Sequence, residues 1–329
     1  MKKKLLLTGA TGHLGNVLLR RLALEDYDIR ILVLPGEETI HINDLDYEKV
    51  IGDISNESDV FKAISGCDYV FHLASMISIE KGKRELLRKV NIEGTKHIVN
   101  ACLKYGIKRL LYLSSVHALT EPAIGTPFVE NTDYTPDLLL GDYAWSKAHA
   151  SLNILKGIDQ GLNTVIVYPS GIIGPHDYQA SNNIVGQIRD FMQKPSNEVI
   201  RYFEGAYDYV DVRDVVDGIM KAFEKGYIGD SFLLTGEKIT VKEMYQTFMT
   251  TCNKPMQMKP ISYNLVKAAA HVSELFARLT KRKPSITTYS VEVLKSNADF
   301  DNTYTRERLN YHPRSFKASI SDTIKWLQE

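Results

Sequence analysis

The chain has 329 residues, of which 44% are hydrophobic and 24% are charged, an ordinary balance for a soluble protein with one large α/β unit or two domains. Lysine plus arginine and aspartate plus glutamate both number 40, so the net charge gives no basis for binding nucleic acid or an anionic membrane. No apolar stretch is long enough to span a bilayer, and the basic run Lys281–Lys283 is typical of a solvated helix end. With three widely spaced cysteines as well, we expect a cytoplasmic protein with no membrane or nucleic-acid partner.

The first predicted elements are a buried strand, a glycine turn and an amphipathic helix within residues 4–22. The turn contains Gly9, Gly12 and Gly15. In such a turn the first glycine adopts a conformation closed to other residues, the second lets a pyrophosphate approach the main chain, and the third lets the helix pack closely on the strand. The alternative is a glycine-rich turn without a ligand, but the strand before it and the helix after it favour nucleotide binding.

Strand-like and helix-like segments then alternate along the first half of the chain. Further strands are expected at 29–34, 50–54, 69–74, 110–114 and 164–168, with helices at 56–65, 86–105 and 143–155. This alternation predicts an α/β fold with a doubly wound parallel sheet.

The pattern changes after residue 170. A strand and helix are expected within 207–225, a short strand at 232–234, and helices at 241–252, 265–279, 291–295 and 320–327. We therefore divide the chain into a dinucleotide-binding domain of residues 1–170, to which 207–235 returns, and a smaller, mostly helical substrate-binding lid of 171–206 and 236–329.

Tyr143 and Lys147 are four residues apart on a predicted helix, so their side chains share one face. A cationic lysine beside a phenol would lower the tyrosine pKa and make it a proton donor near neutrality. Ser114 and Ser115 end the fifth strand, at the edge where open parallel sheets bind ligands, and a serine there can bind a substrate carbonyl. A surface Tyr–Lys pair and a loop-capping serine are the alternatives, and the combination of the three favours catalysis.

With these motifs the chain resembles the extended branch of the short-chain dehydrogenase/reductase family, which implies a Rossmann domain. The resemblance also includes Gly52-Asp53-Ile54, His72-Leu73-Ala74-Ser75, Asn91-Ile92-Glu93-Gly94-Thr95, Pro169-Ser170-Gly171-Ile172-Ile173-Gly174-Pro175 and Tyr209-Val210-Asp211-Val212-Arg213-Asp214-Val215. It implies that Ser115, Tyr143 and Lys147 are catalytic, with Tyr143 passing a proton while a nicotinamide passes a hydride. The cofactor-binding residues that it implies are Gly9, Thr11, Gly12, His13, Leu14, Gly15, Leu34, Asp53, Ile54, Leu73, Ala74, Ser75, Tyr143, Lys147, Pro169 and Ile172; no metal is expected.

Departures from other branches narrow the family assignment. The dehydratases of the family carry Asp-Glu where this chain has Val116 and His117, and its sugar-nucleotide epimerases usually carry a diphosphate-binding arginine where this chain has Tyr207. The chain is therefore most similar to the dihydroflavonol-reductase-like carbonyl reductases. This similarity implies NAD(P)H-dependent reduction of an aldehyde or ketone, or oxidation of the alcohol. Candidate substrate contacts are Met76, Ile77, His117, Tyr178, Tyr207 and Tyr209, each of which could instead be ordinary packing.

Several choices stay open at this point. The resemblance weakly favours NADP over NAD, although Leu34 replaces the arginine expected in NADP-using reductases and Glu37 and Glu38 follow it. An NAD-dependent sugar-nucleotide epimerase and a non-catalytic dinucleotide sensor are the alternatives. A homodimer formed through 86–105 and the Tyr143 helix is a further expectation.

Overall fold

The computed structural model describes residues 2–78, 82–123, 125–131, 133–178, 183–280 and 286–329, so the basic run Lys281–Lys283 lies outside the described residues. Among these residues, seven parallel strands form one sheet in the order β3-β2-β1-β4-β5-β6-β10. The strands are β1 (Lys3–Thr8), β2 (Tyr27–Val33), β3 (Glu48–Ile51), β4 (Tyr69–His72), β5 (Arg109–Leu113), β6 (Thr164–Pro169) and β10 (Ser231–Leu234). The strand order reverses between β1 and β4, and a reversal of this kind opens a ligand crevice at the carboxyl ends of the strands. The predicted doubly wound parallel sheet is confirmed.

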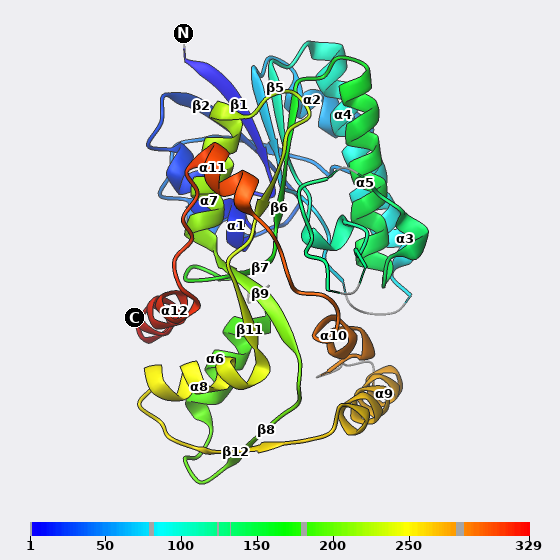
Figure 1. The fold of residues 1–329 in the computed structure, drawn as a ribbon. Coiled ribbons are helices and arrows are strands. Elements are labelled where there is room, and N and C mark those ends of the chain that lie inside the picture. Colours follow the sequence, from blue (N-terminus) through cyan, green and yellow to red (C-terminus); the bar gives the residue numbers. More distant parts are fainter. Residues whose placement is uncertain (1, 79–81, 124, 132, 179–182, 281–285) are drawn as a thin grey trace.

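Helices cover both faces of this sheet (Figure 1). On one side lie α1 (His13–Leu22) and α7 (Val212–Lys225), and on the other lie α2 (Glu57–Ile64), α4 (Gly94–Tyr105) and α5 (Asp142–Asp159). The leucine run of β1 shows why this strand is buried: Leu5 and Leu7 pack into the core under α1 and α7, whereas Leu6 packs into the core under α2 and α4. A strand with apolar residues on both faces is typical of a parallel sheet between two helical layers.

The helix predicted at 86–105 is not regular. It consists of α3 (Arg84–Leu87), a six-residue π-helical segment from Arg88 to Glu93, and α4. A π turn accommodates an extra residue, and turns of this kind occur frequently at functional sites. Apolar periodicity alone predicts the helix but not its wider turn.

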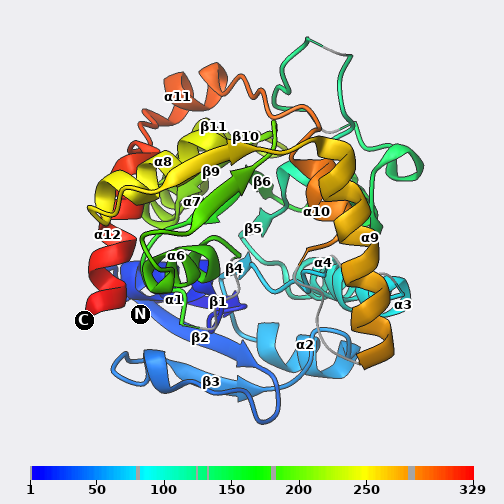
Figure 2. The same ribbon diagram turned by 90° about the horizontal axis from the view of Figure 1, so that it is seen from below.

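The rest of the chain lies beyond the carboxyl ends of the sheet (Figures 1 and 2). In the described part of the chain it contains a three-stranded sheet, β11-β9-β7, and a two-stranded sheet, β12-β8. Its strands are β7 (Gly171–Ile173), β8 (Val199–Tyr202), β9 (Ala206–Asp211), β11 (Glu237–Thr240) and β12 (Gln257–Pro260). Its helices are α6 (Asn183–Gln193), α8 (Val241–Thr251), α9 (Tyr263–Thr280), α10 (Thr288–Val293) and α12 (Phe316–Gln328). Two small cores hold it together, one among α6, α8 and α12 and the other between α9 and α10.

Between α10 and α12 the chain returns to the sheet, where α11 (Thr303–Leu309) contacts β10 and α7. Sequence reasoning missed α6, α11, β7, β8, β11 and β12. The strands have only three or four residues, too few to show an alternating pattern. The division of the chain at residue 170 stays a proposal.

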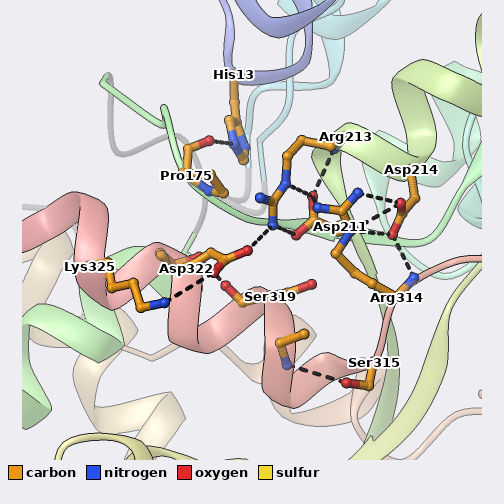
Figure 3. Close-up of polar contacts among 12 residues, drawn as sticks. His13, Pro175, Asp211, Arg213, Asp214, Arg314, Ser315, Ser319, Asp322 and Lys325 are labelled. Carbon is orange, nitrogen blue, oxygen red and sulfur yellow. Dashed lines mark hydrogen bonds and ion pairs between the residues drawn. The ribbon is translucent and has the colours of Figure 1, made fainter.

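A network of ion pairs connects α7 to the C-terminal helix α12 (Figure 3). Arg213 donates to both carboxylate oxygens of Asp211, at 2.8 and 2.7 Å, and pairs with Asp322 of α12 at 2.9 Å. Arg314 forms a second fork, with Asp214. Burial opposes ionisation of Asp211, but hydrogen bonds from Arg213 outweigh it and hold the pKa of this carboxyl below its usual range. The Asp211-to-Asp214 part of the motif thus has a structural role, joining the sheet to α12.

Of the described helices, none combines the length and the apolar character that a membrane crossing requires.

Candidate active site

The glycine turn after β1 has the geometry of a phosphate-binding turn. Gly9 has φ +76°, and a Cβ there would lie 2.8 Å from the Ala74 nitrogen. A Cβ at Gly15 would lie 1.8 Å from the Gly9 oxygen. Gly12, the N-cap of α1, is different, because a Cβ there would meet the chain no closer than 3.6 Å and no side chain caps the helix. The fold therefore requires glycine at 9 and 15, whereas nothing in the described chain requires it at 12.

A hydrogen-bonded chain fixes the segment that follows β4. The Ala74 N–H donates to Thr8 Oγ1 at 3.1 Å, Thr8 Oγ1 contacts His72 Nδ1 at 2.9 Å, and His72 Nε2 contacts Thr95 Oγ1 at 3.1 Å. Burial, assisted by the charge of Lys147, lowers the pKa of His72 to about 3, so the imidazole is neutral. A neutral imidazole donates from one ring nitrogen and accepts at the other, so it can bridge the Thr8 and Thr95 hydroxyls. This chain holds Leu73–Ser75, the segment expected to lie along the cofactor, against β1.

Asn91 of the π-helical segment connects the same loop to α5. Its Oδ1 accepts from the Met76 N–H at 2.8 Å and from the Ser75 hydroxyl at 3.2 Å. Its Nδ2 donates to the Met76 carbonyl and to Ser146 Oγ, both at 2.9 Å. The Ser146 hydroxyl in turn donates to the Tyr143 carbonyl at 2.8 Å. The extra residue of the π turn thus contributes a buried amide that positions the first turn of α5.

Tyr143, Lys147 and Ser115 lie together, as the sequence predicts, but their electrostatics differ from that prediction. Burial lowers the pKa of Lys147 to about 7, and its Nζ donates to the Leu113 carbonyl of β5 at 2.7 Å. Burial also raises the pKa of Tyr143 to about 12, with a hydrogen bond to Ser115 acting in the opposite direction. The expectation that Lys147 lowers the pKa of Tyr143 is therefore wrong for the structure described here. For Tyr143 the effect of desolvation exceeds that of the Ser115 hydrogen bond, and for the buried Lys147 desolvation favours the neutral amine.

His117 lies at the centre of a group of phenols. Its Nε2 is 2.7 Å from the Tyr207 hydroxyl, and its ring lies 6.1 Å from the ring of Tyr143, edge to face, and 6.5 Å from the ring of Tyr289. Burial lowers the pKa of His117 to about 4, so a neutral imidazole shares this hydrogen bond with the Tyr207 hydroxyl. The sequence analysis names His117 and Tyr207 as candidate substrate contacts but does not name Tyr289. Tyr289 follows Tyr143 by almost half of the chain, on a short helix without a recognisable motif.

A pocket of about 360 Å³ opens beside Tyr143, between the first turn of α5 and the helices α9 and α10. Its lining residues are Ser78, Leu140, Gly141, Asp142, Tyr143, Lys267, His271, Thr288, Tyr289 and Glu292. The charges in this lining are paired: Lys267 with Glu292 at 2.8 Å, and Asp142 with Arg84 at 3.4 Å. The pocket therefore presents no unpaired lysine or arginine from its described lining.

The other predicted substrate contacts have different surroundings. Tyr178 stacks on His41 at 3.9 Å and meets Trp326 of α12 edge to face at 5.4 Å, so its ring does not join the phenols around His117. Tyr209 meets the Tyr207 ring edge to face at 5.5 Å and packs against Phe316 in the core of the second lobe, the part of the chain beyond the carboxyl ends of the sheet. Met76 is held through its backbone by Asn91.

The cofactor-binding residues expected outside the glycine turn follow the strand ends at the same edge of the sheet. Glu37, after β2, accepts from the Thr11 hydroxyl of the glycine turn and from the Leu34 N–H at 3.1 Å. Asp53 and Ile54 follow β3, and Asp53 Oδ1 accepts from the Ser55 N–H at 2.8 Å. Pro169 ends β6 and Ile172 lies in β7.

Comparisons with known proteins agree with this geometry. A family model described as the NAD dependent epimerase/dehydratase family matches residues 5–234. Sterol demethylase protein B of Methylococcus capsulatus is 29% identical, over 98% of both chains. A Synechocystis sp. protein with the provisional name dihydroflavonol 4-reductase is 29% identical over 98% of this chain and 93% of its own. The 2-alkyl-3-oxoalkanoate reductase of Stenotrophomonas maltophilia is 26% identical over 99% and 98%, respectively.

Solved structures show the same fold. The crystal structure of gox2253 superposes with a TM-score of 0.83 at 28% identity, covering 99% of this chain and 98% of that one. The UDP-glucose 4-epimerase of Thermotoga maritima, solved with UDP-glucose, superposes with a TM-score of 0.78 at 20% identity over 99% and 98% of the two chains. At that identity the second likeness concerns the fold alone.

Proposed function

Because the chain belongs to the NAD dependent epimerase/dehydratase family, we propose that it is an NAD(P)-dependent oxidoreductase that reduces a neutral aldehyde or ketone, or oxidises the corresponding alcohol. The observation that carries the proposal is the group of Ser115, Tyr143 and Lys147, in which Ser115 and Lys147 are buried and the half-buried Tyr143 lines a pocket at the carboxyl ends of the sheet. The names of two relatives, a dihydroflavonol 4-reductase and a 2-alkyl-3-oxoalkanoate reductase, describe reductases and support this reaction class.

The residues present fit a dinucleotide. Gly12 has no packing reason to be glycine, so its missing side chain fits a ligand that approaches the main chain, with the uncapped N–H groups of α1 available to a pyrophosphate. Leu73–Ser75 would lie along the cofactor, and Lys147 would hold the nicotinamide ribose. When bound, the cofactor supplies or accepts a hydride at its nicotinamide ring.

The chain itself would manage the proton. With its pKa raised, Tyr143 keeps the proton on Oη at neutral pH, ready to donate it to a carbonyl oxygen. Ser115, which hydrogen-bonds to Tyr143, would orient the same oxygen. When the Tyr143 proton passes to the substrate oxygen it leaves a phenolate, and Lys147, with a pKa near 7, can be cationic at neutral pH and so offset that charge.

The pocket supports a neutral substrate. Lys267 and Asp142 are both paired, and Tyr207 is bound to His117, which leaves no guanidinium in the described lining for a diphosphate. These contacts disfavour a sugar nucleotide, so the epimerase alternative rests on family and fold alone.

For the cofactor, we propose NAD rather than NADP, which reverses the weak preference drawn from the resemblance. Thr11 and Leu34 hold the Glu37 carboxylate at the end of β2 and beside the glycine turn. A carboxylate there can accept from the ribose hydroxyls of NAD and would repel a 2′-phosphate.

A homodimer through α4 and α5 stays part of the proposal. These helices pack on each other and form an outer layer of the molecule (Figure 1). Sedimentation velocity at several concentrations tests the dimer: a species of twice the chain mass supports it, and a monomer throughout contradicts it.

The reaction is tested with purified protein, NADH or NADPH, and a panel of uncharged aldehydes and ketones. We expect cofactor oxidation with at least one carbonyl class, and a loss of about a hundredfold or more in kcat for Tyr143→Phe. Tyr105→Phe, on the exposed side of α4, is the matched control and should keep full activity. Dinucleotide binding without turnover of any carbonyl would instead favour a sensor.

A further inference from the structure

Tyr289 carries a polar atom that the fold leaves unsatisfied. Its hydroxyl is buried, yet it makes no hydrogen bond to any described residue. The residue lines the pocket together with Tyr143. Buried donors without partners are rare in folded proteins because they lose their hydrogen bonds to water without replacement.

The backbone around Tyr289 is firmly held, so the position of this phenol is built into the fold. Thr287 and Ser290 form a reciprocal capping box at the start of α10. The N–H and the hydroxyl of Thr288 both donate to the Glu274 carboxylate of α9, each at 2.7 Å. These polar contacts together fix the turn that presents the ring.

The ring of Tyr289 also packs closely on the start of α5. Gly141, the residue before this helix, has φ +86°, and a Cβ there would lie 2.4 Å from Cε2 of the Tyr289 ring. The Tyr289 ring thus lies against the backbone two residues before Tyr143 and near the His117 ring. The packing that brings this phenol near Tyr143 gives its hydroxyl no hydrogen-bond partner among the described residues.

The chemistry of the surroundings limits what this hydroxyl can bind. A neutral phenol both donates and accepts one hydrogen bond, so it suits a keto or hydroxyl oxygen. A carboxylate is a poor candidate, because Asp142 and Glu292 line the same pocket and Lys267 is already paired.

We propose that Tyr289 binds a second oxygen of the substrate, so that the preferred substrates are uncharged ketones or aldehydes that carry a further hydroxyl or keto group near the reacting carbonyl. This inference rests on the proposed function and assigns Tyr289 to specificity. Tyr143 would bind the reacting oxygen and Tyr289 the neighbouring one.

The test compares Tyr289→Phe with wild type on matched carbonyl compounds. Diacetyl and acetoin have a second oxygen that butanone lacks, and acetylacetone has one that methyl propyl ketone lacks. We expect kcat/KM for the three doubly oxygenated compounds to fall about tenfold, mainly through KM, with less than a twofold change for the two simple ketones. Tyr105→Phe is the matched control and should change neither class.

A second measurement separates substrate binding from a structural role. If the Tyr289 hydroxyl has no partner in the free protein, Tyr289→Phe should leave the melting temperature unchanged or raise it. A lower melting temperature, an equal loss for both classes of ketone, or no loss for either would overturn the inference while leaving the proposed reaction intact. Failure of wild type to turn over any carbonyl would overturn both.

Discussion

Lys147 and Tyr143 lie in surroundings where burial outweighs charge. Lys147 is 3% exposed, and both groups are shifted toward their neutral forms, the lysine to a pKa of about 7 and the tyrosine to about 12. A site of this kind can exchange a proton with a carbonyl compound without holding a buried ion for long. Because its pKa is lower in the folded chain, Lys147 decreases the free energy of unfolding at pH values below its unfolded pKa.

This cost gives a prediction for stability against pH. The unfolded chain protonates Lys147 below pH 10.5, whereas the folded chain protonates it only below about pH 7, so the unfolded state binds more protons between these values. Stability from this residue therefore rises with pH across that window, by on the order of 5 kcal/mol. Urea unfolding at several pH values gives the free energy of unfolding of wild type and of Lys147→Met. The value for wild type should rise with pH relative to that of the variant across this window. Parallel curves would contradict the lowered pKa.

Glu37 gives a prediction for cofactor choice. Glu37→Gln removes the negative charge but keeps an oxygen for the Leu34 N–H, while its amide nitrogen can donate to the Thr11 hydroxyl, so NADPH should bind about fivefold to tenfold more tightly while NADH changes little. Calorimetric titration of the apo-protein measures both affinities. Glu38→Gln is the matched control, because Glu38 is exposed and should leave the NADPH to NADH ratio unchanged. Tighter NADPH than NADH binding in wild type would contradict the proposed preference.

At the residue scale, the sequence predicted the parts of the site that depend on local spacing. Tyr143 and Lys147 share a helix, and Ser115 and His117 follow a strand end, so their proximity follows from the order of elements. The contribution of Tyr289 and the separation of Tyr178 from the pocket depend on how the second lobe folds. Residue spacing carries no information about that packing.

At the element scale, the π-helical segment places a side chain that connects two other parts of the site. Because the turn is widened at Arg88–Glu93, Asn91 is buried and reaches both the loop after β4 and the first turn of α5. A regular helix over the same residues would present different side chains to these partners. The apolar spacing that predicts the helix is compatible with either form.

Asn91→Ala tests this support. The variant leaves the Met76 N–H and carbonyl and the Ser146 hydroxyl without the amide, so we expect a loss of about 2–4 kcal/mol in the free energy of unfolding. The catalytic rate should fall more than KM rises, since Tyr143 depends on this contact for its position. Asn100→Ala, at an exposed position of α4, is the control and should change stability by less than about 0.5 kcal/mol. If the two variants had the same stability and kinetics, Asn91 would not position α5.

At the scale of the whole molecule, the sheet was predictable and the second lobe was not. The strands of the sheet have continuous apolar runs separated by helices of ordinary length, and both features are visible along the chain. In the second lobe, short strands from distant segments pair with one another, as β7 and β11 both do with β9. Such pairings depend on the tertiary fold, so patterns within a few residues do not reveal them.

At this scale, the ion-pair network of Figure 3 explains how α12 is attached to the sheet. Arg314 follows α11 and Asp214 opens α7, with a hundred residues between them, and the carboxylate accepts both from the guanidinium and from the Arg314 N–H. Asp214 is 8% exposed, so its pairing is less screened by water than a surface ion pair.

A double-mutant cycle on Asp214→Ala and Arg314→Ala measures this attachment. We expect each single variant to lower the free energy of unfolding by about 2 kcal/mol, and the pair to show a coupling of about 1–2 kcal/mol, because either change leaves the other side chain without its partner. The exposed pair Lys238 and Asp299, with side chains 46% and 55% exposed, is the matched comparison and should couple by less than about 0.5 kcal/mol. If both cycles gave the same small coupling, the Asp214 fork would be no more than another surface pair. The docking of α12 would then rest on its apolar contacts with α6 and α8 and on the Arg213–Asp322 pair.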